Sequence, residues 1–310
     1  MIGVITYYKT CSNALTVTEE PQIGSWISVV EPTQAEIEKL IEEFGLDTGF
    51  VKSSLDEEES SRVEIEDNQT LIIVDTPYAE TQAENTILYY TLPIGIIITD
   101  SYVFTISSKD NPVLTDLSSG VVKGLQTNLK TRFVLQLLLR ITARFLQCLK
   151  QIDKISNALE QQLHGSMQNR ELIQLLGLEK SLVYFTTSLK ADDVTLEKIL
   201  RGRVIKLYEE DQDLLEDVLI EVKQAIEMAN IYSGILSGMM DAFASVTSNN
   251  LNMVMWRLTT ITIIMAIPTM IYSFYGMNTK GLPIAHTWFP TLISVIITGV
   301  VAFFLLKKKK

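Results

Sequence analysis

The sequence predicts an α+β membrane protein with a soluble α/β domain, a long helix and two membrane spans. Three observations predict this fold class: strand-like segments over the first 110 residues, an apolar repeat along one helical face from Leu215, and two uncharged apolar runs near the C-terminus. The last sixty residues hold no Asp or Glu, although the whole chain has a net charge of -11. A chain of 310 residues with 47% hydrophobic positions is long enough for about two domains.

The first 110 residues read as a mixed α/β domain. One segment predicts a helix, because Thr33 can act as the N-cap, Glu36 completes a capping box and Gly45 supplies a stop. Around it, segments rich in β-branched and aromatic residues and bounded by turn formers predict strands. These are MIGVITYY (1–8), SWISVVEP (25–32), LIIVDTPY (71–78), NTILYYTLPIGIIIT (85–99) and YVFTISS (102–108).

Strand signals fade after about residue 112, and long helices follow. We expect helices over Thr131–Leu163 and roughly 171–200. From Leu215, apolar residues then recur at alternating steps of three and four, which predicts a heptad seam packed on another helix, within a subunit or between subunits, or on the core of its own domain. The series is Leu215, Val218, Val222, Ala225, Ala229, Tyr232, Leu236, Met239, Phe243 and Val246.

No proline or cap interrupts the chain between Leu215 and the first apolar run, so this helix is expected to continue into the membrane. A helix of some sixty residues would be about 90 Å long. Such a rod would pass movement in the soluble domain to the span, which suggests a gated pore.

Two uncharged runs, Leu258–Thr279 and Trp288–Leu306, qualify as spans, since each can cross roughly 30 Å of hydrocarbon at about 1.5 Å per residue. Their short link predicts an antiparallel hairpin. Arg257 and the terminal lysines flank its ends, against Lys280 in the link, so both termini should be cytoplasmic. We expect a multi-pass protein of the cell (plasma or inner) membrane whose link faces outward.

One side of the first span carries polar or small residues at steps of three and four. Their hydroxyls could simply bond back to helix carbonyls, or the stripe could line water. A two-helix hairpin cannot enclose a lumen, so the second alternative requires several subunits around an axis. The stripe comprises Asn252, Met255, Thr259, Thr262, Ala266, Thr269 and Ser273.

Other function classes find little support. The N-terminus does not read as a signal peptide, and Cys11 and Cys148 are too few for a metal finger and fit a reducing compartment. His164 and His286 form no ligand cluster, and no phosphate-binding loop is present. We therefore predict no enzyme, no prosthetic group and no nucleic-acid partner. A membrane-anchored sensor or scaffold stays as an alternative.

Near the C-terminus, Tyr275, Gly276, Met277 and Asn278 stand at the exit of the penultimate span, before a short loop and a last span ending in lysines. This arrangement resembles the CorA family of divalent metal-ion transporters (magnesium, cobalt, nickel), and SWISVVEPTQAEIEKLIEEFGL is similar to the family's N-terminal domain. The resemblance implies a homopentamer that carries Mg2+, with Co2+ and Ni2+ as further cargo.

The resemblance also implies a division of the chain. It gives a cytosolic α/β/α funnel domain (1–200), a stalk helix (201–252), a pore-lining transmembrane helix 1 (253–275), an outer Gly-Met-Asn loop (276–287), transmembrane helix 2 (288–306) and a basic cytosolic tail (307–310).

Site residues follow from the same resemblance. Gly276, Met277 and Asn278 would form the selectivity filter, with Asn278 gripping the ion through its waters. Asn252, Met255 and Leu258 match the cytoplasmic part of the pore, where the apolar pair would act as a hydrophobic gate. Pro268 stands one residue nearer to Tyr275 than in the commonest members, which affects the register of Thr269 and Ser273 as lumen residues. The predicted pore-lining set also includes Thr259 and Thr262 from the polar stripe.

Asp217 lies in an acidic run at the start of the stalk, from Glu209 to Glu221, and matches a family position implicated in binding Mg2+ between subunits. High cytosolic Mg2+ would then close the pore, so that Mg2+ is both substrate and regulator. The alternative for this run is a solvated helix face.

The loop after the filter departs from many relatives. NTKGLPIAHTW contains no carboxylate and offers Lys280 and His286 instead, although a basic mouth would not concentrate cations. Mg2+ stays the favoured ion, and a transition metal such as Zn2+, Co2+ or Ni2+ is the alternative.

Overall fold

The computed structural model describes residues 4–11, 14–81, 87–122, 124–165, 169–202, 205, 207–277, 286 and 288–307, without the side chains of residues 4, 162–165, 169 and 202. The chain divides into two compact units, residues 1–239 and 240–310. Each is described by itself below.

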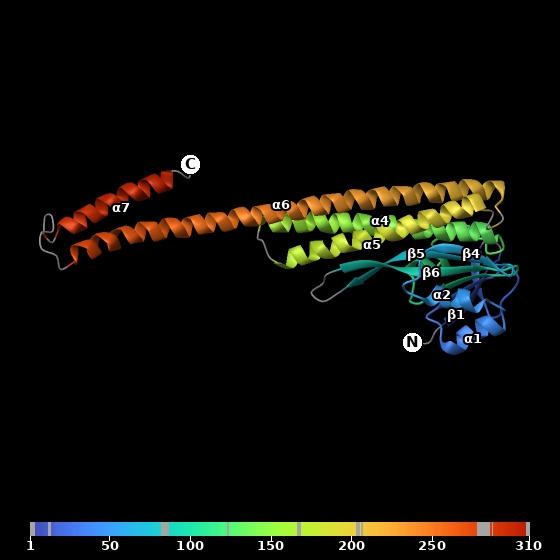
Figure 1. Ribbon diagram of the computed structural model, residues 1–310. Coiled ribbons are helices and arrows are strands. Elements are labelled where there is room, and N and C mark those ends of the chain that lie inside the picture. Colours follow the sequence, from blue (N-terminus) through green and yellow to red (C-terminus); the bar gives the residue numbers. More distant parts are fainter. Residues whose placement is uncertain are drawn as a thin grey trace. The chain divides into compact units, whose positions relative to one another are not determined.

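The first unit is built on a seven-stranded sheet with the strand order β2-β1-β3-β7-β6-β5-β4 (Figure 1). The β3 and β7 strands pair in parallel, and the other neighbours pair antiparallel. The longest ladder joins β5 to β6. The strands are β1 (Val4–Cys11), β2 (Ala14–Thr18), β3 (Trp26–Val30), β4 (Arg62–Glu66), β5 (Gln69–Thr81), β6 (Ile87–Ile98) and β7 (Val103–Ser107).

Alternation along the central strands gives each face of the sheet its own core. On β3, Ile27 and Val29 join Leu40 of helix α1 (Gln34–Glu42) and Phe50 of helix α2 (Thr48–Leu55) in one buried cluster. Thr33 caps α1 with the predicted capping box. These two short helices therefore cover one face of the sheet.

The opposite face is covered by α4 (Lys130–Gly165) and α5 (Asn169–Gly202). Trp26 stands next to Ile27 on β3 but packs on Phe133 of α4, with ring centroids 5.3 Å apart. Tyr89 of β6 meets Phe185 of α5 at 6.0 Å. The first unit is thus a three-layer α/β/α sandwich, which confirms the predicted fold class.

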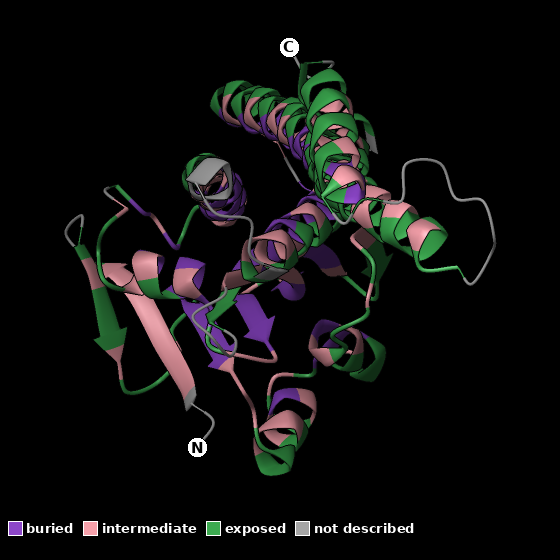
Figure 2. Cartoon of the chain, turned by 90° about the vertical axis from the view of Figure 1, so that its left-hand side faces the viewer, coloured by how far each residue is buried: buried purple, intermediate pink, exposed green. Residues whose placement is uncertain are grey.

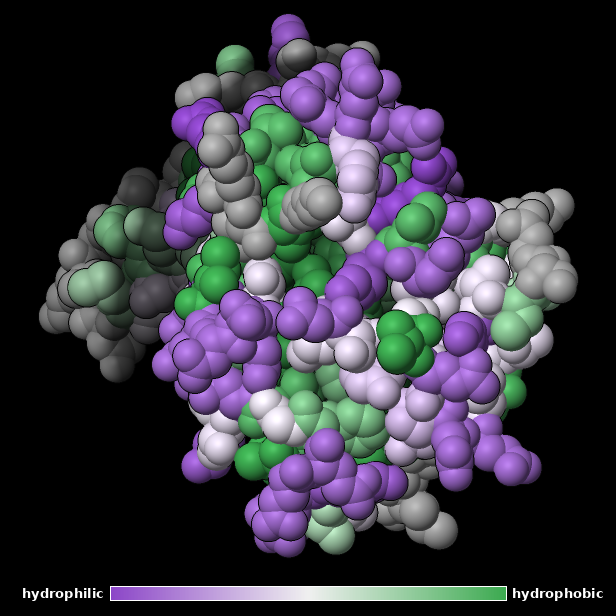
Figure 3. All heavy atoms as spheres, turned by 90° about the vertical axis from the view of Figure 1, so that its right-hand side faces the viewer, coloured by the Kyte–Doolittle hydropathy of each residue, from purple (hydrophilic) through white to green (hydrophobic). Residues whose placement is uncertain are grey.

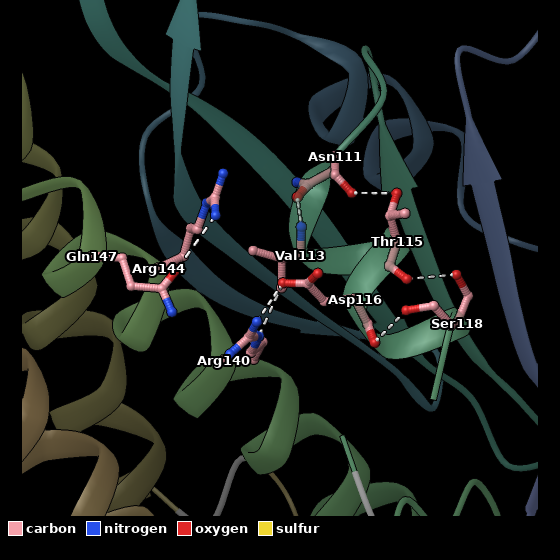
Figure 4. A network of polar contacts seen from close by, with 9 residues as sticks. Asn111, Val113, Thr115, Asp116, Ser118, Arg140, Arg144 and Gln147 are labelled. Atoms are coloured by element: carbon pink, nitrogen blue, oxygen red, sulfur yellow. Dashed lines mark hydrogen bonds and ion pairs between the residues drawn. The ribbon is translucent and has the colours of Figure 1, made fainter. Parts of the chain in front are cut away.

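Helix α3 (Pro112–Ser118) connects the sheet to α4 through a polar network (Figure 4). Asn111 caps α3 by accepting a hydrogen bond from the Val113 N–H at 2.9 Å. Asp116 at the other end of this short helix pairs with Arg140 of α4, whose two nitrogens lie 2.5 and 3.1 Å from one carboxylate oxygen. These contacts orient the start of the long-helix layer.

Helix α6 (Glu209–Tyr275) is 67 residues long and contributes to both units, and α7 (Phe289–Lys307) follows in the second. An uninterrupted helix leading into the first span is therefore confirmed. In the first unit α6 lies beside α5, where Lys223 and Glu197 form an ion pair at 3.4 Å (Figure 1).

The seam of α6 packs within its own chain over residues 215–239. Leu215, Val218, Val222, Ala225, Ala229, Leu236 and Met239 are buried there, and Tyr232 is half-buried. Beyond it, in the second unit, Phe243 is buried and Val246 is exposed in the single chain.

Predicted and observed elements agree best where the pattern is long. The helices expected over Thr131–Leu163 and 171–200 are α4 and α5, and the five expected strands are β1, β3, β5, β6 and β7. The sequence patterns do not predict β2 and β4, which form the sheet edges. Figure 2 shows the contrast between the buried central strands and the exposed edge.

The surface of the first unit has the polar character expected for contact with water. On the face drawn in Figure 3, hydrophilic side chains predominate and hydrophobic areas lie between them. Exposed ion pairs such as Lys109–Glu57, at 3.2 Å, belong to this kind of surface and contribute little to stability.

Candidate functional site

The residues predicted to line a pore lie on one stripe of α6. At 100° per residue, Asn252, Met255, Leu258, Thr259, Thr262, Thr269 and Ser273 fall within about 120° of the helix circumference. All of these side chains are exposed in the single chain. The stripe is therefore an open surface of one protomer.

The opposite side of α6 is partly covered. Thr260 is buried, and Ile264, Ile267 and Ile271 are half-buried, in contrast to the stripe residues. On the same 100° projection these positions lie about 120–180° from the middle of the stripe, with their centre about 150° away. The predicted pore residues thus point away from the covered side of the second unit.

Three threonines of the stripe bond back to their own helix. The Thr259 hydroxyl donates to the Met255 carbonyl at 2.8 Å, Thr262 to Leu258 at 2.9 Å, and Thr269 to Met265 at 3.1 Å. Back-bonding, one of the two sequence alternatives, is therefore observed. It uses the hydroxyl proton and leaves the oxygen lone pairs free to accept a hydrogen bond from outside the helix.

The end of α6 carries the first residues of the predicted filter. The Gly276 N–H donates to the Tyr272 carbonyl at 2.9 Å, and the Met277 N–H to Phe274 at 3.4 Å. A Cβ on Gly276 would lie 3.1 Å from the Tyr272 oxygen. Glycine thus permits a close backbone approach here. Asn278 and Lys280 lie outside the described residues.

Contacts that the sequence patterns do not predict join α6 to α7 beside this point. The Tyr272 hydroxyl donates to Thr291 Oγ1 at 3.2 Å, and the rings of Tyr275 and Phe289 meet edge-on with centroids 6.3 Å apart. Trp288 precedes α7 and is exposed, while Lys307 at its other end lies 5.6 Å from the Phe303 ring. A tyrosine hydroxyl inside an apolar run was the available signal.

The acidic run at the start of α6 has mixed surroundings. Asp211 is buried and accepts a hydrogen bond from the Tyr208 N–H at 3.3 Å, and Glu210 pairs with Arg132 of α4 at 3.1 Å. Acidic groups in a first helical turn also stabilise the helix dipole. Asp217 is exposed, and the described residues hold no group of three His, Cys, Asp or Glu side chains that could bind a metal.

The two cysteines differ in environment. Cys148 is buried, and burial raises the pKa of its thiol to about 11. A thiol with this pKa stays protonated at neutral pH and is a poor nucleophile. Cys11 is exposed at the end of β1.

Both long apolar helices have the length and composition to cross a membrane. Only 6% of the most apolar window of α6 and 11% of that of α7 are buried within the chain, unlike the core helices of a soluble protein. The fold and these helices define an α/β/α domain followed by two candidate membrane spans.

Comparison with known proteins specifies the family. The family model described as CorA-like Mg2+ transporter protein matches residues 22–308, and the chain belongs to this family. The cobalt/magnesium transport protein CorA of Methanocaldococcus jannaschii is 30% identical over 88% of this chain and 86% of its own length. The protein of the same name from Thermotoga maritima is 24% identical, over 92% and 83% respectively.

Solved structures agree with this assignment. The complete structure of the CorA magnesium transporter from M. jannaschii superposes with a TM-score of 0.80 at 25% identity, covering 99% of this chain and 98% of that one. The architecture of the whole chain, including the two candidate spans, is therefore that of a CorA protein.

Proposed function

We propose that this chain is one protomer of a homo-oligomeric divalent cation channel or transporter, with five copies around the conduction axis and Mg2+ as the main cargo. The proposal takes its ion class from the CorA relatives and its pathway from this chain's residues. The protomer acts as a transporter rather than an enzyme, and the ion is its substrate rather than a resident cofactor.

The observation that carries the proposal is the placement of the polar stripe. Its residues lie on the uncovered side of α6, in the same helix that ends at Gly276 and Met277. Several copies arranged with this side inward would enclose a lumen lined by hydroxyl groups, while α7 would face lipid.

The donors available suit a hydrated ion. Mg2+ sheds its waters reluctantly, so a conduit works best by accepting hydrogen bonds from those waters. Thr259, Thr262 and Thr269 have already donated their protons within the helix and can only accept from the lumen side. Asn278 would add amide oxygens at the outer mouth without the deep trap of a carboxylate ring. Met255 and Leu258 would form the hydrophobic gate at the other end.

Regulation and orientation complete the proposal. The N- and C-termini lie in the cytoplasm, with the domain division given above, and Mg2+ bound at Asp217 between subunits holds the pore closed. A divalent ion moving inward gains about 4.6 kcal/mol per 100 mV, twice the value for a unit charge. Membrane potential alone can therefore drive uptake.

A transition-metal cargo is the second candidate, because the loop after the filter offers Lys280 and His286 and no carboxylate. Imidazole suits Zn2+, Co2+ and Ni2+ better than it suits Mg2+. A sensor or scaffold anchored by the two spans is less well supported, since it gives no reason for the polar stripe.

The test is ion flux into liposomes containing the purified full chain, with Mg2+, Co2+, Ni2+ and Zn2+ in turn. Asn278→Ala should lower the flux of the preferred ion by about 10-fold or more, as expected for the loss of about 1.4 kcal/mol or more of recognition. Asn250→Ala, off the stripe on the same helix, is the matched control and should conduct normally. Equal flux in all three proteins would contradict the filter assignment.

A further inference from the structure

Tyr272 makes a hydrogen bond that joins α6 to α7. Its hydroxyl donates to Thr291 Oγ1 at 3.2 Å. Tyr272 lies in the last turn of α6, which ends at Tyr275, and Thr291 lies in the first turn of α7, which begins at Phe289. The contact therefore joins the two helix ends that bracket the outer link.

The backbone of Tyr272 also contacts the start of the Gly-Met-Asn segment. Its carbonyl accepts the Gly276 N–H at 2.9 Å, and the same oxygen would lie 3.1 Å from any Cβ placed on Gly276. One residue thus holds α7 through its side chain and Gly276 through its main chain. A movement of Tyr272 would move Gly276 with it.

A ring contact supports the same junction. Tyr275 and Phe289 meet edge-on with centroids 6.3 Å apart and an interplanar angle of 73°. The Phe289 N–H donates to the His286 carbonyl at 3.1 Å, which ties α7 to the end of the link. Aromatic packing alone permits sliding, whereas a hydrogen bond between side chains has a defined direction.

We propose that Tyr272 and Thr291 are positioning residues that hold the first filter residue in place against α7. The idea rests on the proposed function, since it assumes that residues 276–278 recognise the ion. Their hydrogen bond then sets how tightly the entrance binds a hydrated Mg2+ ion. Losing the bond weakens recognition and leaves the lumen and the gate intact.

Two substitutions remove the bond with little change of shape. Tyr272→Phe deletes only the hydroxyl, and Thr291→Val replaces the hydroxyl by a methyl group. Each should raise the external Mg2+ concentration that gives half-maximal flux by about 3- to 10-fold, the range expected for one interhelical hydrogen bond in a membrane. The double variant should be no worse than the stronger single variant, because both remove the same bond.

Control variants distinguish a positioning role from a general loss of structure. Thr291→Ser keeps the hydroxyl and should restore the natural half-maximal concentration. Thr298→Val removes a hydroxyl of α7 that has no partner among the described residues, and it should leave the flux curve unchanged. A structural role alone would lower the maximal flux in every variant and would not favour serine over valine at position 291.

The outcomes are distinguishable. If Asn278→Ala changes recognition while Tyr272→Phe and Thr291→Val leave the half-maximal concentration unaltered, the positioning role is wrong and the filter assignment stands. If Thr291→Ser behaves like Thr291→Val, the hydroxyl is not the cause and the positioning role is again wrong. If Asn278→Ala changes nothing, the proposed function and this inference fail together.

Discussion

Asp192 of α5 and Asp75 of β5 bring two carboxyl groups close together where α5 packs on the sheet. Asp192 is buried, and its Oδ1 accepts hydrogen bonds from the Ser61 hydroxyl at 2.7 Å and from the Asp75 N–H at 3.0 Å. Burial raises the pKa of Asp192 well above its ordinary value, and the Asp75 carboxyl raises it further. Burial also raises the pKa of Asp75, while the Ser188 hydroxyl opposes that shift.

The pair therefore makes stability depend on pH in a defined direction. A carboxyl with a raised pKa binds its proton more tightly in the folded state, so its favourable contribution is complete below the unfolded pKa of about 3.9 and is lost as pH rises through the folded value. Each unit by which the pKa differs between the folded and unfolded states changes the free energy of unfolding by about 1.4 kcal/mol. Asp192→Asn keeps the acceptor oxygen and carries no charge. We expect its thermal midpoint to exceed that of the natural chain at pH 8, with a smaller difference at pH 5.

The measurement is thermal unfolding of the detergent-solubilised full chain at the two pH values. Asp213→Asn, at an exposed position of α6, is the control and should match the natural chain at both. Parallel loss of stability with pH in Asp192→Asn and the natural chain would show that the buried pair does not titrate in this way.

Some of these residues could be predicted from sequence and others could not. Asp192 occupies a position of the buried stripe that also holds Leu189, Leu196 and Ile199, so the spacing itself signals an enclosed carboxyl. Its partner Asp75 lies 117 positions away, which no local pattern reveals. The Tyr272–Thr291 bond depends likewise on the pairing of two helices, whereas the grouping of the polar residues on one stripe follows directly from the 3.6-residue period.

At the scale of elements, β6 and α2 pack closely against each other at Gly95. A Cβ placed on Gly95 would lie 1.8 Å from Ser54 Oγ and 2.3 Å from Ser54 Cβ. Ser54 is buried and donates to the Phe50 carbonyl at 2.7 Å. The absence of a side chain at Gly95 lets α2 lie directly on the strand.

Gly95→Ala should therefore destabilise the protein by about 1–3 kcal/mol, the usual cost of overpacking a core. Gly177→Ala is the matched control, because a Cβ there meets nothing within 4 Å and the position is inside α5. It should stabilise the helix by about 0.5–1 kcal/mol. Denaturant unfolding of both variants measures whether each change lowers or raises the free energy of unfolding. A neutral Gly95→Ala would mean that α2 can shift away without cost.

Elements differ in how strongly the sequence predicts them. The helix predicted over Thr131–Leu163 matches α4 within a few residues, because the apolar pattern repeats over many helical turns. In β2 and β4, most residues are exposed, and the pairing with the neighbouring strand supplies the stability that the local pattern lacks. Helices α2 and α3 are held by their caps, Asp47 and Asn111, which are short signals easily taken for turns.

At the scale of the whole molecule, α6 is the element common to both units, with residues 209–239 in the first and 240–275 in the second. The surface of α6 differs between the two units. The part in the first unit buries an apolar face on its own domain, whereas the part in the second leaves a polar stripe open. The central claim is that further copies enclose this stripe around water.

Cysteine labelling in liposomes tests this claim most directly. In a chain carrying Cys11→Ser and Cys148→Ala, single cysteines are placed by Thr262→Cys and Thr269→Cys on the stripe and by Val295→Cys on α7, where the side chain is 67% exposed in one protomer. With Mg2+ chelated, a charged, membrane-impermeant thiol reagent should modify positions 262 and 269 and leave 295 unmodified, because water reaches only the first two. Modification of position 295 with the two stripe positions protected would place the stripe in lipid and contradict the account.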